Sequence, residues 1–459
     1  MTPGDDFSDA FDRAWSEDKA AEDKREQEQQ SQPNGADPGC AKSAKSAVSP
    51  GWPEPLDPAA FHGLAGDVVR ALEPHSEADP VALLLQFLAA FGNACGRSHY
   101  IPVEGDRHPP QIWIVAVGET SKARKGTSWG RIRQLFASAA PHWTQERVLS
   151  GLSSGEGVIW NVRDPIVRRV LDKKSGEHVD EETDAGVTDK RLLVIESEFA
   201  SSLRHMERTG NTLSGTLRCL WDRGDVRSLT KNSPAATTGS MVSVVGHVTL
   251  DELRRYLTRT EMANGLANRF LFACVRRSKA LPFGGGPVDL DPLAVRVTDR
   301  LGRIEARGEQ VVMWTHSARG IWAEVYPELS EGKPGMVGAT TSRAEAQVLR
   351  LTLAYALLDG VTVIEPAHLI AALAVWRYCN DSAAYLFGSA LGDPLADEIR
   401  QALEAAPNGL TRTNIRDLFG RHKDAGDIAR ALDLLLQRGL VRSETRGTGG
   451  RPTETWFAQ

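Results

Sequence analysis

The sequence predicts an α/β protein with a mostly parallel sheet, a following helical region and a small C-terminal domain. An apolar run, Ile112–Val117, ends at a glycine and leads through a basic loop into a helix-forming segment. Further apolar runs alternate with helical segments, the order of a parallel sheet covered on both faces. Residues 393–459 contain three helical segments followed by two strand-like segments around a Gly-rich tip. We therefore expect a core at 56–285, a helical domain at 286–390 and a C-terminal domain at 391–459.

The amino-terminal segment differs from the rest in charge. Residues 1–50 hold eleven Asp or Glu and six Lys or Arg, so they contribute 6 − 11 = −5 to a net charge of −6. Such a segment buries too little apolar surface to offset the entropy of ordering, so residues 1–55 are predicted to form a disordered acidic tail. The remaining chain is nearly neutral, and nucleic-acid binding then depends on local clusters of basic residues.

The cysteine spacing and the lack of a signal peptide indicate a cellular compartment. The five cysteines are scattered, with no Cys-x-x-Cys or Cys/His spacing typical of a metal site, so we expect reduced thiols and a cytoplasmic protein. The amino terminus lacks the basic-then-apolar order of a signal peptide. The longest apolar run, Val81–Cys95, is too short to span a bilayer, so it predicts a buried helix and no membrane partner.

The core elements follow in order along the chain. Helices are predicted near 61–72 and 81–93, a strand pair near 99–103, and a helix from the basic loop to about 140. A Gly/Ser-rich turn and a helical segment come next, and the charged stretch 173–190 is expected to be a surface loop. Buried strands are then predicted at 192–195, 241–245 and around 270–275, with helices near 200–208, 213–221 and 250–259, and with a hairpin over 224–238.

The later segments are mainly helical. The repeat in 343–359 predicts a helix that stops at Gly360, and a second helix follows Pro366. In the C-terminal domain, three helices and a two-stranded wing are the order of a winged helix-turn-helix.

The basic loop after the first buried strand is the candidate phosphate-binding segment. Backbone N–H groups of such a loop, together with the next helix's amino terminus, attract phosphate. Lys125 is the candidate contact for the β- and γ-phosphates, and a hydroxyl of Thr127 or Ser128 is a candidate Mg²⁺ ligand. The usual spacing is G-x-x-x-x-G-K-[ST], whereas here Lys125 falls one place late and precedes Gly126, so a basic surface turn is the alternative. The complete candidate segment is Gly118, Glu119, Thr120, Ser121, Lys122, Ala123, Arg124, Lys125, Gly126, Thr127 and Ser128.

Two acids end the second buried strand. Glu196 and Glu198 flank Ser197 directly after Leu192–Ile195. A site that hydrolyses nucleotides needs one carboxylate near Mg²⁺ and another that orients the attacking water. The two acids supply both, and the alternative is a solvated acidic edge.

Two further polar residues lie at strand ends. His247 follows the apolar residues 241–245 and is a candidate contact for the γ-phosphate or the water; the alternative is a structural histidine. Arg269 stands where a loop enters a strand. An arginine supplied to a neighbouring subunit's nucleotide stabilises transition-state charge, and a surface arginine that pairs with an acid is the alternative.

Several stretches together resemble an uncharacterised P-loop family found in phage, plasmid and other mobile-element proteins, often fused to a primase-polymerase domain. They are "VGETSKARKGTSW", "LLVIESEFASSLRHMERTGNTLSGTLRCLWD", "LTKNSP", "GHVTLDEL" and "ANGLANRFLF", and the resemblance covers roughly 57–279. It implies ATP and Mg²⁺ as cofactors and a separate primase or polymerase as a partner, because this chain has no room for that domain.

A more distant similarity is to the AAA+ class of P-loop proteins, whose core is RecA-like, and within it to the minichromosome-maintenance helicases. The phosphate loop, "ESEF", "NRF" and the later helices follow the same order as in those helicases. The resemblance implies that Glu198 orients water, Arg269 acts in trans and Arg343 is a lid arginine. The sequence departs from it at Ser197, where a metal-associated Asp is usual and whose task Glu196 would take. It also departs at His247, where Asn is usual.

Basic residues suggest two DNA contacts. In ring helicases of this type the hairpin after Trp221 faces the pore, so Arg223, Arg227 and Lys231 would meet the phosphate backbone; a solvated hairpin is the alternative. Residues 410–451 hold nine Lys or Arg and five Asp or Glu, a net of 9 − 5 = +4. Arg446 and Arg451 flank the tip of the expected wing and suit phosphate or minor-groove contact, although many winged helices bind protein instead.

The sequence thus predicts an ATP-dependent DNA-processing motor, a ring-forming helicase-like ATPase in the replication of a mobile element. A DNA-binding initiator or regulator that binds nucleotide without turnover is the second hypothesis, because the loop spacing and Ser197 depart from the usual pattern. An anti-phage defence ATPase is a third hypothesis, and nothing in the sequence separates it from the first.

Overall fold

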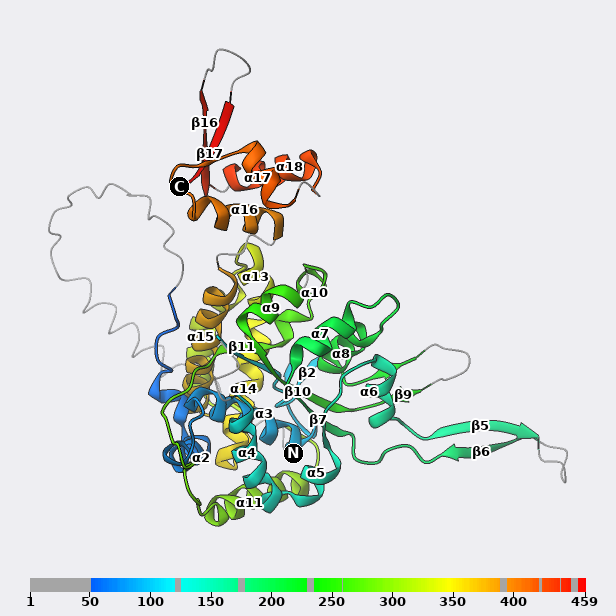
Figure 1. Cartoon of the computed structure of the whole chain (residues 1–459). Helices are drawn as coiled ribbons and strands as arrows, with labels where there is room; N and C mark the ends of the chain where they lie inside the picture. Colours follow the sequence, from blue (N-terminus) through cyan, green and yellow to red (C-terminus); the bar gives the residue numbers. More distant parts are fainter. Residues whose placement is uncertain are drawn as a thin grey trace, which may run out of the picture. The chain divides into compact units, whose positions relative to one another are not determined.

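The computed structural model describes residues 51–119, 125–171, 178–228, 235–257, 259–388, 394–420, 423–437, 439–446 and 453–459 (Figure 1). Nearly all of the predicted acidic tail, residues 1–50, lies outside this set. Its last five predicted residues, 51–55, are described, and Trp52 packs edge-on against Tyr385 with ring centroids 5.4 Å apart. The end of the predicted tail therefore packs on the folded core.

A five-stranded, all-parallel sheet forms the centre, as the alternation of apolar and helical segments predicted. Its spatial order is β11-β3-β10-β7-β4. The later strand β10 lies between β3 and β7, and Gly246 on β10 is level with Val115 on β3 and with Glu196 on β7. The strands are β3 (Ile114–Gly118), β4 (Val148–Leu149), β7 (Arg191–Glu196), β10 (Met241–Thr249) and β11 (Leu271–Cys274).

Alternating side chains give each face of this sheet its own core. Ile114 and Ala116 point to one face, while Trp113, Val115 and Val117 point to the other. Because the side-chain period of a strand is two, one apolar run supplies both cores. The second face is covered by α6 (Gly155–Asn161), α7 (Phe199–Met206), α8 (Leu213–Asp222), α9 (Leu250–Tyr256) and α10 (Arg259–Ala263), and by the 3-10 turn η4 (Ala267–Arg269).

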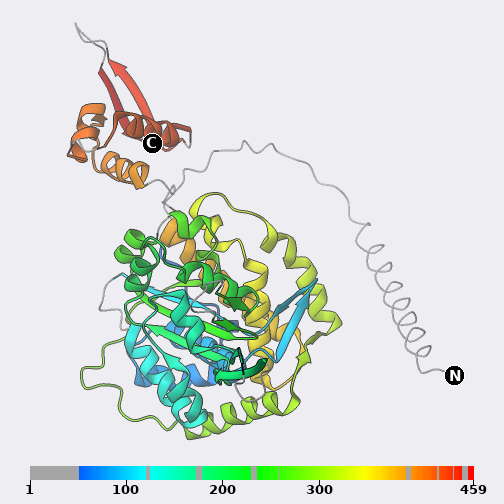
Figure 2. The same cartoon turned by 90° about the vertical axis from the view of Figure 1, so that its right-hand side faces the viewer.

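Helices that precede β3 in the sequence and helices that follow β11 together cover the first face of the sheet (Figure 2). Residues of α14 and α15 belong to the same hydrophobic cluster as those of α2 and α3, so region 286–390 is helical as predicted but has no separate core of its own. Gly360 ends α14 in the left-handed conformation, with φ 78°, as its position predicted. The elements are η1 (Pro58–Phe61), α2 (Gly63–Leu72), η2 (Glu73–His75), α3 (Pro80–Cys95), α4 (Lys125–Ala139), α5 (Pro141–Glu146), α11 (Asp291–Arg307), α12 (His316–Ser330), α13 (Gly335–Thr341), α14 (Ala344–Asp359) and α15 (Pro366–Phe387).

Smaller sheets of two or three strands lie outside the central sheet. The predicted strand pair is β1 (His99–Val103) with β2 (Asp106–His108), and β12 (Gln310–Val311) joins β1 in parallel. The predicted hairpin is β8 (Val226–Arg227) with β9 (Ala236–Thr237), and β13 (Met313–Trp314) pairs with β14 (Val363–Ile364).

The prediction of a surface loop over 173–190 is wrong for residues 178–184, whereas residues 185–190 are a loop as predicted. Residues His178–Asp184 form β6, which pairs antiparallel with β5 (Ile166–Leu171) in an arm that projects from the core in Figure 1. Both faces of this arm carry charged residues, so the alternation of apolar and polar residues that marks a half-buried strand is missing.

The C-terminal region has a separate hydrophobic cluster, centred on Ile399, Leu432 and Trp456. Three helices and a hairpin occur in the predicted order, and a short strand, β15, joins the hairpin. Residues 447–452 at the hairpin tip lie outside the described residues. The elements are α16 (Pro394–Glu404), β15 (Leu410–Thr411), α17 (Arg412–Leu418), α18 (Ala425–Gln437), β16 (Val441–Arg446) and β17 (Thr453–Ala458).

Within the described residues, no helix combines the length and the apolar character that crossing a bilayer requires. The run at 81–95 forms α3, which is buried along nearly its whole length, as predicted. The four described cysteines, Cys95, Cys219, Cys274 and Cys379, are all free thiols.

Candidate nucleotide site

The carboxyl ends of β3, β10 and β7 form the candidate phosphate site. Gly118 is the buried last residue of β3, Glu119 is exposed, and α4 begins at Lys125. The predicted contacts Thr120, Ser121, Lys122, Ala123 and Arg124 lie outside the described residues, and only the backbone of Lys125 is described. The strand and the fifteen-residue helix therefore follow one another in the predicted order.

The first turn of α4 separates the two candidate hydroxyls. Thr127 is exposed, and Gly126 has open space where a Cβ would lie. Ser128 is completely buried, and its Oγ accepts a 2.6 Å hydrogen bond from Nε2 of Gln86 on α3. Of the two candidate hydroxyl residues, Thr127 is thus the one open to solvent, while Ser128 ties α4 to α3.

The two acids at the end of β7, Glu196 and Glu198, also differ in burial. Glu196 is 8% exposed, and one carboxylate oxygen accepts hydrogen bonds from the backbone N–H groups of Gly151 (2.6 Å) and Leu152 (2.8 Å). Glu198 is exposed in the turn between β7 and α7. Glu196 therefore anchors the loop after β4, and Glu198 is the acid whose carboxylate reaches solvent.

Close packing fixes the position of Glu198. The next residue, Phe199, packs over Gly246 of β10, where a Cβ would come within 2.7 Å of the ring. Any larger residue at 246 would displace the start of α7 and the turn that carries Glu198. His247, the neighbour of Gly246, is 2% exposed and opposite Ala116 of β3, so it lies on the face that α4 covers and within the sheet's interior.

The two predicted arginines meet at the opposite, amino end of the sheet. Arg269 lies in the 3-10 turn before β11 and Arg343 directly before α14. Nη2 of Arg269 donates a 2.6 Å hydrogen bond to Oδ2 of Asp222, and Nη1 of Arg343 lies 3.4 Å from Oδ1 of the same carboxylate. Asp222 ends α8, so three distant segments converge on one acid.

These arginines cannot serve their own phosphate loop. The register pairs Leu271 of β11 with Ile114 of β3, so Arg269 lies about six residues before the level of Gly118, roughly 20 Å along the strands. A phosphate bound at Gly118 would therefore lie beyond the reach of Arg269 of the same chain. The Arg269 side chain is 5% exposed, and burial, followed by repulsion from neighbouring arginines, lowers its pKa despite the bond to Asp222.

The predicted DNA contacts are only partly described. Arg223 and Arg227 are exposed, the first after α8 and the second on β8. Lys231 and Arg451 lie outside the described residues, and of Arg446 only the backbone is described, as the last residue of β16. Arg412 and Arg416 on α17 are exposed and line a cleft of about 440 Å³ in the same domain, a basic feature that the sequence reading did not single out.

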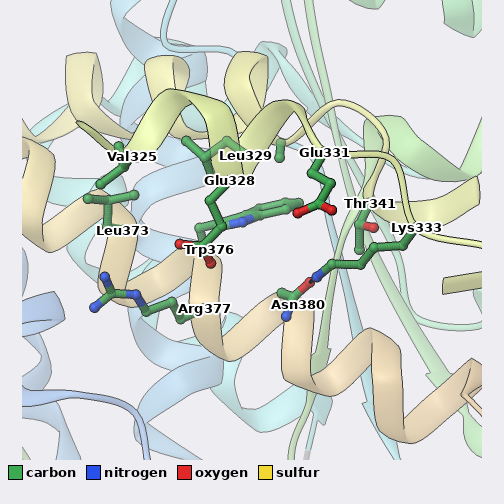
Figure 3. Close-up of a pocket in the computed structure, with 11 residues that line it drawn as sticks. Val325, Glu328, Leu329, Glu331, Lys333, Thr341, Leu373, Trp376, Arg377 and Asn380 are labelled. Atoms are coloured by element: carbon green, nitrogen blue, oxygen red, sulfur yellow. Dashed lines mark hydrogen bonds between the residues drawn. The ribbon is translucent and has the colours of Figure 1, made fainter. Parts of the chain in front are cut away.

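A cavity between α12, α13 and α15 contains none of the predicted site residues (Figure 3). Its volume is about 60 Å³, the space of a few water molecules and far below the roughly 300 Å³ of a small-molecule site. Figure 3 shows Glu328 and Glu331 around the indole of Trp376, and Nζ of Lys333 donates a 2.7 Å hydrogen bond to Asn380. The cavity is too small for a nucleotide.

His62, Asp359 and His368 are close enough to hold a metal ion, but their hydrogen bonds fit a structural cluster better. Nδ1 of His368 accepts a hydrogen bond from the backbone N–H of Glu365, so its hydrogen must sit on Nε2, which faces Asp359 at 3.1 Å. A metal on Nε2 would leave Nδ1–H pointing at another donor. Burial raises the pKa of Asp359, but hydrogen bonds from His368 and His62 outweigh it and lower the pKa overall.

Asp222 and its neighbour Trp221 are the residues that sequence reasoning missed. Nothing in "CLWDRG" distinguishes them from an ordinary helix end, because their partners come from residues 269, 343 and 350. No protein-family model matches this chain, and no curated protein matches its sequence.

Proposed function

We propose that this protein is a nucleotide-dependent DNA-processing motor, a ring-forming helicase-like ATPase in the replication machinery of a mobile element. One observation carries the proposal. The phosphate-loop order and the exposed acid Glu198 lie at the carboxyl end of the sheet, while Arg269 and Arg343 share a carboxylate at its amino end. In a head-to-tail ring, one end of each subunit meets the opposite end of the next, so every site is completed by a neighbour.

The described residues at the carboxyl end fit ATP with Mg²⁺. The N–H groups at the start of α4 suit a phosphate, and the exposed Thr127 offers a hydroxyl to the metal. The bound metal would neutralise charge that develops on the phosphates. Glu198 is placed to accept a hydrogen bond from water at the same strand end, and Glu196 is less suited to the metal because it already accepts two backbone hydrogen bonds.

The DNA part of the proposal rests on basic residues in two regions. Arg223 and Arg227 are exposed beside the β8–β9 hairpin, and the C-terminal region carries a net charge of +4 over 410–451. Its order of three helices and a β16–β17 hairpin supports a winged helix. Phosphate contacts of this kind are independent of sequence, as a translocating motor needs.

The decisive experiment is ATP hydrolysis by the full chain with and without single-stranded DNA, comparing the wild type with Glu198→Gln. We expect DNA to stimulate the wild type and the variant to lose about 10²–10⁴-fold in rate, because the amide cannot activate water. Glu207→Gln removes an exposed acid at the other end of α7 and should leave the rate unchanged. Equal rates for the wild type and Glu198→Gln would contradict the proposal.

A second function is favoured by one observation, the engagement of Glu196 with Gly151 and Leu152. Ser197 stands where a metal-associated acid would be, so the end of β7 offers one exposed carboxylate, that of Glu198, instead of two. A DNA-binding initiator or regulator that holds ATP without turnover has such a site. Tight nucleotide binding with no phosphate release, with or without DNA, would favour this function over the motor.

A further inference from the structure

Three arginines from separate segments surround the end of α8. The guanidinium carbon of Arg350 lies 3.5 Å from the ring centroid of Trp221, and those of Arg343 and Arg269 lie 5.1 and 5.5 Å from it. Stacking on one indole is favourable for each guanidinium. It also brings three positive charges together, and the acid among them is Asp222.

The charges in this cluster do not balance. Arg350 is 1% exposed and bonds to neutral oxygens, with Nη2 donating to the carbonyl of Trp221 at 2.9 Å and Nη1 to Gln111 at 3.3 Å. Burial, together with repulsion from neighbouring arginines, lowers its pKa well below the ordinary value. The donors Nε of Arg269 and Nε of Arg350 are buried without a hydrogen-bond partner among the described residues, and Oδ1 of Asp222 has only the Arg343 contact at 3.4 Å. One carboxylate thus faces three guanidinium groups, and the cluster can take up further negative charge.

The cluster is open to solvent on one side. The side chains of Asp222 and Arg343 are 35% and 36% exposed, whereas that of Arg269 is 5% exposed. Asp222 lines a cleft of about 630 Å³ at the amino end of the sheet, together with three arginines and three further acids: Arg97, Arg107, Arg223, Asp106, Asp225 and Glu309. Asp222 is thus the member of the cluster that lines this cleft, and the half-exposed Arg343 lies beside it.

We propose that Asp222 is an exchangeable counter-ion and a positioning residue for the trans arginines. In the free chain its carboxylate holds Arg269 and Arg343 side by side, and it yields them to an incoming phosphate group. This inference rests on the proposed function, in which that phosphate belongs to a nucleotide bound by a second copy of this chain. Asp222 and the phosphate compete for the same N–H donors, so removing the carboxylate should strengthen phosphate binding.

The test is calorimetric titration of inorganic phosphate into the full chain at low ionic strength. We expect Asp222→Asn to bind phosphate roughly tenfold more tightly than the wild type, the effect of one competing charge-assisted hydrogen bond. Asp225→Asn is the matched control, because Asp225 lines the same cleft but accepts from the backbone N–H of Gly239. The double variant Asp222→Asn with Arg269→Gln should lose the gain.

Each outcome bears on the inference. A merely structural role for Asp222 predicts weaker phosphate binding in the variant, since disorder would disperse the arginines. An equal gain in Asp225→Asn, or no gain in Asp222→Asn, would overturn the exchange. Should Asp222→Asn not fold, Arg343→Gln replaces it, because Arg343 contacts the same carboxylate and its side chain is 36% exposed. Phosphate should raise the melting temperature (Tm) of that variant less than it raises the Tm of the wild type. An equal rise in both would contradict the inference.

The inference and the proposed function fail separately. Phosphate binding to the Asp222 cluster is measured without nucleotide hydrolysis, so a gain in Asp222→Asn with no ATPase activity in the wild type would leave the anion site standing and remove the motor. ATP hydrolysis by the wild type without tighter phosphate binding in Asp222→Asn would support the motor and contradict the anion site.

Discussion

Two adjacent hydroxyl residues at the start of α4 have separable tasks. Thr127 is exposed, whereas Ser128 is buried and accepts a hydrogen bond from Gln86. We expect Thr127→Ala to keep its stability within about 0.5 kcal/mol and to lose roughly tenfold or more in ATP turnover, since a metal-bound hydroxyl is worth about 1.4 kcal/mol or more. Ser128→Ala should cost about 1–3 kcal/mol in the free energy of unfolding, because it leaves the buried amide of Gln86 without its acceptor.

Urea unfolding and steady-state ATPase assays on the two variants check this prediction, each variant serving as the control for the other. A loss of turnover in Ser128→Ala at unchanged stability, with Thr127→Ala unaffected, would reverse the assignment. The sequence left this choice open because both residues are hydroxyls one position apart. Burial decides between them, and it depends on α3, some forty residues earlier.

At the level of elements, sequence patterns predicted the buried strands and missed the hairpin that is exposed on both sides. The strands at 192–195 and 241–245 were predicted because apolar runs mark a buried parallel sheet. The β5–β6 arm was not, because a hairpin with solvent on both faces has no apolar alternation. Its strands are instead matched by charge, with Arg168 opposite Glu181 and Arg169 opposite Asp180.

One carboxylate, that of Asp359, bridges two histidines where η1 and α2 meet α14 and α15. Oδ2 of Asp359 lies 2.7 Å from Nε2 of His62 and 3.1 Å from Nε2 of His368. We expect Asp359→Asn to lower the free energy of unfolding at neutral pH by about 1–3 kcal/mol, because the amide cannot accept both hydrogen bonds as a carboxylate does. Burial raises the pKa of Asp359, but the two hydrogen bonds lower it overall, so this stabilisation is present above the unfolded pKa of about 3.9.

The stabilisation should disappear as the pH falls through the lower, folded pKa of Asp359. Urea titrations of the wild type and Asp359→Asn between neutral and acidic pH measure the difference. Asp299→Asn removes a more exposed ion pair with Arg303 and should cost less than about 1 kcal/mol. A difference between the wild type and Asp359→Asn that grows towards acid would contradict the assignment.

At the scale of the whole molecule, the two ends of the central sheet carry complementary halves of one predicted site. Sequence motifs predicted the residue types in each half, Lys125 and Glu198 in one, Arg269 and Arg343 in the other. Their separation is a property of sheet topology, since β11 and β3 are neighbouring parallel strands and Arg269 lies before the start of one while Gly118 ends the other. The helical region from α11 to α15 packs into the same core, so both halves belong to one folded unit.

Mixing two inactive chains tests this separation directly. Lys125→Ala should abolish turnover at its own phosphate loop but can still offer Arg269 to a neighbour, and Arg269→Ala should do the opposite, losing about 10³–10⁵-fold alone. In an equimolar mixture, about one quarter of head-to-tail contacts pair an intact Lys125 with an intact Arg269, so roughly a quarter of wild-type ATPase activity should return.

The mixture of Lys125→Ala with Glu198→Gln is the control, because both changes lie in the same half. Every contact in that mixture has an intact Arg269, but no chain carries both Lys125 and Glu198, so no activity should return. Recovery in the control, or full activity of Arg269→Ala alone at low protein concentration, would mean that hydrolysis is completed within one chain.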